Sequence, residues 1–177
     1  MKEELAQIEE QLLVMDAQDG DVKAMDELVS RWQRPLWQYA FRLTADHEAA
    51  WDITQESWLG IIKGLRKLQD PANFKAWAYR ITTNKSFDWM KRRSAVPQIS
   101  IEDVRAHHRE RNSDTGLVEL LEKLDAKDRA ILSLYYFEQL SISEVSVALN
   151  IPEGTAKSRL HTARKRLKEL WQQHVDR

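Results

Sequence analysis

Residues 141–166 carry the sequence feature that most restricts how this chain can fold. Ser141-Ile142-Ser143-Glu144 has the form of a capping box, in which Ser141 and Glu144 satisfy backbone amides at the start of a helix. That helix is short, and Asn150 can take the left-handed conformation that ends it. Pro152 is tolerated in a first helical turn, so it can begin a second helix. A capped helix, a tight turn and a second helix form the helix-turn-helix pattern.

The second helix of this pattern has one apolar side and a basic remainder. Ala156, Leu160 and Ala163 recur at helical spacing and predict the buried side. The rest of the circumference carries cations and hydroxyls: Lys157, Ser158, Arg159, His161, Thr162, Lys165 and Arg166. Such a face is suited to phosphates and base edges, so the pattern favours DNA binding over a merely solvated basic surface.

Composition narrows the remaining choices. The chain of 177 residues has only five Gly and four Pro, and its helical periodicity predicts an all-α fold. It has no cysteine, which excludes a disulfide framework and a cysteine nucleophile, and its five histidines lack metal-ligand spacing. We therefore expect no metal and no cofactor. No apolar run could span a bilayer and no signal peptide is visible, so we expect a cytoplasmic protein without membrane insertion.

The periodicity divides the chain into two small helical domains. Residues 1–93 form the first, with helices expected over 22–43, 46–67 and 72–92 and a kink or local opening at Pro35. Residues 94–115 lose the periodicity and predict a flexible linker. Residues 116–177 form the second domain, with helices expected near 116–123, 126–138, 142–149 and 152–172.

The expected helix 46–67 has a mixed outer face. Opposite its apolar side lie Asp52, Gln55, Glu56, Leu59 and Lys63. An apolar residue in the middle of a polar face, as Leu59 is, is typical of a protein-docking patch. From these residues alone, a docking surface and a solvated face stay equally supported. Asp52 and Glu56 could also form an acid/base pair, but no further catalytic group accompanies them, so we do not expect an enzyme.

The expected helix 72–92 interleaves aromatic and basic side chains. Residues 80–93 hold five bases and one acid, Trp89 lies among them, and Tyr79 directly precedes them. Aromatic rings beside cations can stack unpaired bases and neutralise phosphates, as in proteins that bind single strands. The alternative is that Trp77 and Trp89 belong to the core.

Four motifs, in this order and at this spacing, resemble those of the extracytoplasmic-function (ECF) group of bacterial sigma factors. They are Ala17–Val29, Asp52–Trp58, Phe74–Asn84 and Ile151–Leu160. The resemblance covers about residues 12–172 and implies an initiation factor with sigma region two and region four. Such a factor binds core RNA polymerase and directs it to promoters. A stand-alone helix-turn-helix regulator would share the second domain but leave both outer faces of the first domain unexplained.

The resemblance also implies roles for three groups of residues. Core RNA polymerase would be bound by Asp52, Gln55, Glu56 and Leu59. The downstream promoter element would be contacted by Asn73, Tyr79, Arg80, Lys85, Lys91, Arg92 and Arg93. The upstream element would be contacted by Gly154, Thr155, Lys157, Ser158, Arg159, His161, Thr162 and Lys165. Phosphate contacts are expected from Arg164, Lys165 or Arg166, and an anti-sigma factor is expected as a further partner.

Charge is divided unevenly between the two ends. Residues 1–28 hold nine acids and two bases, whereas residues 153–177 hold seven bases and three acids. This asymmetry permits a closed form of the free protein. In that form the face around Asp52 or the face around Lys157 could be covered, and promoter binding would be poor.

Overall fold

The computed structural model describes residues 2–95 and 115–175, and these ranges contain helices but no strand. The main helices are α1 (Lys2–Asp19), α2 (Val22–Thr44), α3 (His47–Gly64), α4 (Phe74–Ala95), α5 (Thr115–Glu122), α6 (Ala126–Leu132), α7 (Ile142–Leu149) and α8 (Glu153–Val175). Short 3-10 turns, η1 (Leu65–Lys67) and η2 (Pro71–Asn73), precede α4, and a π turn, η3 (Ser133–Phe137), follows α6. The all-α prediction is confirmed. The expected linker falls almost entirely on residues 96–114, outside the described ranges.

Local capping explains where the helices of the second domain begin and end. The Asp125 side chain accepts the Asp128 amide at 2.8 Å, and Ser141 and Glu144 form the predicted capping box. Asn150 ends α7 with a φ of 52°, in the left-handed region that asparagine tolerates. The predicted capping box and the predicted role of Asn150 are confirmed, so the turn between α7 and α8 is determined by its own residues.

The first domain differs from its predicted helices in two places. Helix α1 occupies a segment for which the sequence predicted no helix, and it packs against α2 with Val14 and Ala17 buried. Helix α2 runs from Val22 to Thr44 with Pro35 inside it, so the local opening expected at this residue does not interrupt the helix. Proline removes only one backbone bond, and the adjacent turns are held by the buried side chains of Trp32 and Leu36.

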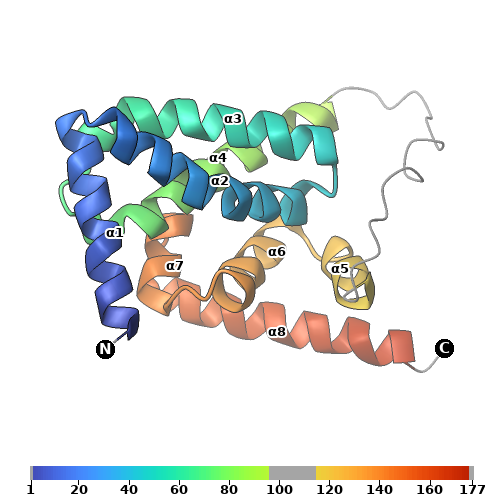
Figure 1. The fold of residues 1–177 in the computed structure, drawn as a ribbon. Coiled ribbons are helices and arrows are strands. Elements are labelled where there is room, and N and C mark those ends of the chain that lie inside the picture. The colour runs from blue at the N-terminus through green and yellow to red at the C-terminus, as the bar shows by residue number, and fades with distance from the viewer. Residues whose placement is uncertain (1, 96–114, 176–177) are drawn as a thin grey trace.

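The two domains share one closed arrangement. Figure 1 shows α3 along one edge of the molecule and α8 along the opposite edge, with α2, α4, α6 and α7 between them. Helix α4 packs against α7, and α2 contacts α5, α6 and η3. One apolar cluster contains Leu28 and Leu36 of the first domain together with Ile131 and Leu160 of the second. Opening the molecule would therefore expose apolar surface to water.

Glu138 joins the domains by polar contacts. The π turn ends at this residue, whose amide donates to the Ser133 carbonyl at 3.1 Å. The Glu138 carboxylate accepts a hydrogen bond from Arg42 of α2 at 2.7 Å and another from the Tyr79 hydroxyl of α4. The Arg42 guanidinium also lies 4.5 Å from the centre of the Phe137 ring. Burial raises the pKa of Glu138, and the positive charge of Arg42 opposes this shift.

The closed form is thus held by the buried pair of Glu138 and Arg42 and by apolar packing. The sequence had instead indicated attraction between the acidic start and the basic end of the chain. A second polar contact supports it, because Arg129 of α6 donates to the Leu43 carbonyl of α2 at 2.7 Å. Asp52 and Lys157 both remain exposed in this arrangement. The expectation that closure covers one of their faces is therefore wrong for this conformation.

Candidate polymerase and promoter surfaces

Helix α3 presents the mixed face that the sequence predicted. Its N-cap, Asp46, accepts the Ala49 amide at 3.0 Å, and Ile53, Ser57 and Ile61 are buried on the inner side. The outer side carries Asp52, Gln55, Glu56 and Leu59. Leu59 is 58% exposed, which is unusual for a leucine flanked by polar residues on a helix that already buries one complete side.

Ile62 extends this outer face, and the sequence analysis missed it. It lies three residues beyond Leu59, is 50% exposed, and borders a shallow cleft with Val22 and Met25. The i, i+3 spacing from Leu59 was the available signal. Two exposed apolar side chains on adjacent turns make a stronger docking patch than Leu59 alone.

Glu56 and Lys85 form an ion pair between α3 and α4, with their charged atoms 3.2 Å apart. Both side chains remain partly exposed, so water screens the pair and its contribution to stability is small. In this conformation Lys85, which lies on α4, therefore contacts the outer face of α3 through Glu56.

The turn before α4 exposes Asn73. Asp70 caps η2 by accepting the Ala72 amide at 2.9 Å, and its second oxygen accepts the Asn73 side-chain amide at 3.2 Å. Lys91 and Arg92 are exposed near the other end of α4. The turn and the helix thus present an amide at one end and cations at the other.

Two further residues assigned to the downstream element lie on α4. Arg80 is partly exposed on α4. Arg93 pairs with Asp46 at 2.8 Å, and its guanidinium lies 5.0 Å from the centre of the Trp89 ring. Arg93 therefore braces the end of α4 against the start of α3 in this conformation.

Tyr79 is a core residue, contrary to its predicted place on a DNA-binding face. Its side chain is 1% exposed and makes edge-on ring contacts with Trp32 and Tyr39, at 5.9 and 5.2 Å between ring centres. Its hydroxyl donates to Glu138. The prediction failed because α4 is covered on more than one side, by α2 and α3 of its own domain and by α7 of the other.

Helix α8 turns its predicted basic face outwards. Ala156, Leu160 and Ala163 are buried as the periodicity predicted. The exposed residues are Gly154, Thr155, Lys157, Ser158, His161, Thr162 and Lys165, and Arg159 is partly buried. Two of the hydroxyls are used within the helix, since Ser158 donates to the Thr155 carbonyl and Thr162 to the Ser158 carbonyl, each at 3.1 Å. These bonds leave the lone pairs of both hydroxyl oxygens able to accept a further hydrogen bond.

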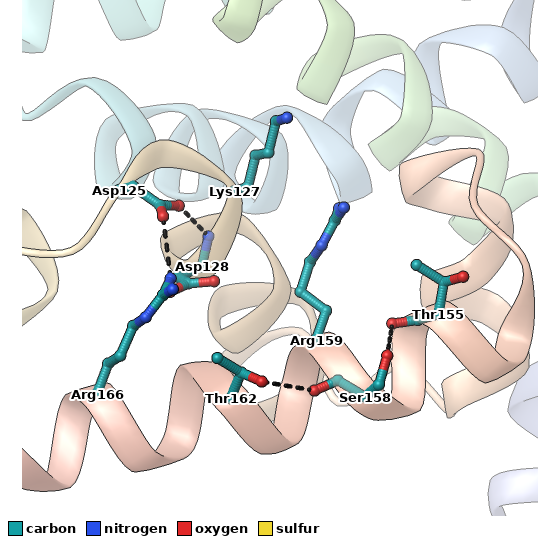
Figure 2. Close-up of a pocket in the computed structure, with 8 residues that line it drawn as sticks. All are labelled: Asp125, Lys127, Asp128, Thr155, Ser158, Arg159, Thr162 and Arg166. Carbon is teal, nitrogen blue, oxygen red and sulfur yellow. Dashed lines mark hydrogen bonds and ion pairs between the residues drawn. The ribbon is translucent and has the colours of Figure 1, made fainter.

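Arg164 and Arg166, two of the three residues expected to contact phosphate, are exposed and also make contacts within the domain. Arg166 reaches back to α6, where it donates to Asp128 at 2.5 Å and to Asp125 at 3.2 Å, as Figure 2 shows. Arg164 lies 5.1 Å from the ring centre of Tyr135. All three residues are exposed, so the phosphate contacts stay a prediction, and Lys165 has no partner among the described contacts.

Lys127 is a second residue that the sequence analysis missed. It lies on α6 and, with Asp128, Arg159 and Thr162, lines a polar cleft beside α8. Figure 2 shows the side chains of Lys127 and Arg159 extending from facing helices towards the same side of this cleft. No sequence signal could have found Lys127, because its position beside α8 results from tertiary packing.

The described part of the chain contains no group of histidine, aspartate or glutamate residues that could hold a metal ion. Within the same ranges, no helix is both long and apolar enough to cross a membrane.

Comparisons with known proteins agree with this arrangement. Residues 28–96 match the family model for sigma-70 region 2, and residues 115–167 match the model for sigma-70 region 4. The ECF RNA polymerase sigma factor SigE of Mycolicibacterium smegmatis is 32% identical over 91% of this chain and 67% of its own length. The ECF sigma factor SigW of Bacillus subtilis is 25% identical over 88% of this chain and 93% of its own length.

A solved structure has the same fold over most of the chain. It is that of the sigma factor RpoE from Bartonella quintana, in complex with the anti-sigma factor NepR. This sigma factor is similar with a TM-score of 0.72 and 25% identity, covering 88% of this chain and all of that one.

The region-two and region-four folds, in this order, define a transcription initiation factor of the sigma-70 class. This chain belongs to the ECF sigma factors, and it is an alternative sigma factor that directs transcription. A stand-alone helix-turn-helix regulator would not account for the match over residues 28–96.

Proposed function

We propose that the outer face of α3 binds core RNA polymerase through Asp52, Gln55, Glu56, Leu59 and Ile62. The observation that carries this proposal is the exposure of Leu59 and Ile62 among polar residues on a helix whose opposite side is fully buried. Apolar side chains at the centre of a polar rim are the usual arrangement of a protein-docking site. Helix α3 lies along the edge of the molecule away from α8 (Figure 1), and Leu59 and Ile62 are exposed in this closed form.

Two other surfaces are suited to promoter DNA. For the downstream element we propose Asn73 in its turn, with Arg80, Lys91 and Arg92 along α4. For the upstream element we propose the exposed face of α8 around Lys157, with Arg159 and Lys127 at its side. The paired residues Lys85 and Arg93 can join the first surface only if they leave Glu56 and Asp46. Tyr79 would support its helix from the core.

An anti-sigma factor is the proposed regulator. The support comes from the Bartonella quintana sigma factor, whose structure was solved in such a complex. A partner of this kind could stabilise the closed arrangement that Glu138 and the shared apolar cluster already favour. We propose a cytoplasmic location, where the polymerase and the promoter are found.

Size-exclusion chromatography of the chain with purified core RNA polymerase, without DNA, tests the main proposal. We expect the two to elute together and the complex, but neither component alone, to start transcription from a promoter library. An interaction with DNA that is unaffected by polymerase, together with separate elution, would contradict polymerase docking.

Gly154 offers a test of the α8 surface in which stability and DNA binding should move in opposite directions. A methyl group built at Gly154 meets no atom within 4 Å beyond its chain neighbours and the backbone of its own helix. Gly154→Ala should therefore stabilise the free chain by about 0.5 kcal/mol, because alanine has less backbone entropy to lose. We also expect it to weaken promoter binding by the holoenzyme, because the added methyl group would stand where the start of α8 approaches phosphate.

Thermal unfolding and promoter-binding titrations measure the two effects. Lys123→Ala, an exposed change outside the α8 surface, is the control and should leave promoter binding unchanged. A Gly154→Ala variant that is more stable and binds the promoter normally would remove the start of α8 from the proposed DNA contact.

A further inference from the structure

Helix α1 is apolar on two opposite sides, and only one of them is covered. Its inner side packs on the first domain through Val14 and Ala17. Its outer side carries four large apolar residues that are about half exposed: Leu5 at 55%, Ile8 at 52%, Leu12 at 53% and Met15 at 49%. Figure 1 shows α1 at the periphery of the molecule, running away from the ends of α2 and α3. Neither polymerase docking on α3 nor DNA binding on α4 and α8 uses this side.

The spacing of the outer residues is that of a coiled-coil seam. Steps of three, four and three residues separate Leu5, Ile8, Leu12 and Met15, which places them at alternating a and d positions of a heptad. A helix that only packs on its own domain does not need a second, narrow apolar seam. The regular spacing therefore points to a partner that is itself a helix.

The charges beside the apolar seam of α1 indicate the charge that the partner helix carries. In the same heptads Glu9 and Asp16 occupy e positions and are exposed, and Glu4 occupies a g position. Residues 2–19 contain six acids and one base. A second copy of α1 would bring carboxylates opposite carboxylates, which disfavours pairing between two copies of this chain. An anionic membrane surface would be repelled in the same way.

We propose that the outer face of α1 is a docking site for an amphipathic helix of another protein, with apolar residues at a and d and with Lys or Arg at e and g. Its apolar seam would cover Leu5, Ile8, Leu12 and Met15. Its cations would lie against Glu9 and Asp16, where opposite charges at flanking positions determine partner choice. This contact is separate from the α3 face, so its failure and the failure of polymerase docking are distinguishable.

Two synthetic peptides and the full chain test the proposal. Both peptides have about three heptads with Leu at a and d, and they differ only in carrying Lys or Glu at e and g. Fluorescence anisotropy should show that the Lys peptide binds at least about tenfold more tightly than the Glu peptide. The variant Ile8→Ser/Leu12→Ser should lose about tenfold or more of this affinity. Its thermal unfolding should be unchanged, because both side chains are on the surface.

A charge exchange and a matched control complete the design. Glu9→Lys/Asp16→Lys should reverse the preference, so that the Glu peptide binds more tightly. Leu59→Ser/Ile62→Ser removes two equally exposed apolar residues from α3 and should leave peptide binding intact. Unchanged binding by the Ile8→Ser/Leu12→Ser variant, or equal affinity for both peptides, would overturn the proposal. Dimerisation of the wild-type chain that Ile8→Ser abolishes would overturn it as well, by identifying a second copy as the occupant.

Discussion

The variant Glu56→Lys/Leu59→Ala should lose its binding to core RNA polymerase. Each change removes a contact from the proposed α3 docking face, and hot-spot residues in protein interfaces cost about 2 kcal/mol or more each. Two such losses correspond to a decrease of roughly a thousandfold in affinity, which surface plasmon resonance against immobilised polymerase can measure. Both positions are at least partly exposed, so the free energy of unfolding should change by only about 0.5 kcal/mol for each.

The matched control is Asp26→Lys/Val175→Ala. It makes the same kind of charge reversal and removes an apolar side chain that is 63% exposed, close to the 58% of Leu59, and Val175 lies outside both proposed protein-docking faces. We expect this variant to bind polymerase as the wild type does. If Glu56→Lys/Leu59→Ala is folded and keeps normal affinity for polymerase, the α3 face is not the docking surface.

Removal of the Glu138 carboxylate should open the molecule. In Glu138→Ala, the Arg42 guanidinium and the Tyr79 hydroxyl would lose the acceptor that satisfies both between the domains. Breaking a buried ion pair by removing one partner costs about 3–5 kcal/mol. Here the Glu138 and Arg42 side chains are only 8% and 16% exposed, so solvent can compensate little of this loss in the closed form. Small-angle X-ray scattering should show a larger radius of gyration, and the domains should unfold separately on heating.

Glu138→Gln distinguishes the charge from the hydrogen bonds. The amide oxygen can still accept from Arg42 or Tyr79, so we expect an intermediate opening. Because burial raises the pKa of Glu138, the closed form binds more protons than the open or unfolded chain between the ordinary and the raised pKa. The closed form should therefore lose stability as the pH rises through that window, and Glu138→Gln should lack this dependence. Glu122→Ala, an exposed change on α5, is the control. Identical scattering and unfolding for Glu138→Ala and the wild type would mean that this pair does not hold the domains together.

Local patterns were sufficient for much of this protein. Ser141, Glu144 and Asn150 specify the turn before α8 because capping depends on atoms within a few residues of one another. The outward position of Lys157 and the buried position of Leu160 follow from helical periodicity once the helix is recognised. The same reasoning placed Leu59 on an exposed face of α3, and the spacing of that face should also have led to Ile62.

Tertiary packing alone decided the rest. Tyr79 has the sequence context of a surface aromatic among cations, yet it is buried because its helix is covered from two domains. In the sequence, Arg166 is one of several bases expected to contact phosphate. In the structure, it also donates hydrogen bonds to Asp125 and Asp128, at the start of α6. Glu138 and Arg42 form a buried pair although they are far apart in the chain. Glu138 ends a π turn, which helical periodicity does not reveal. A sequence determines which side of each helix is apolar, whereas the partner that each side meets depends on how the helices pack.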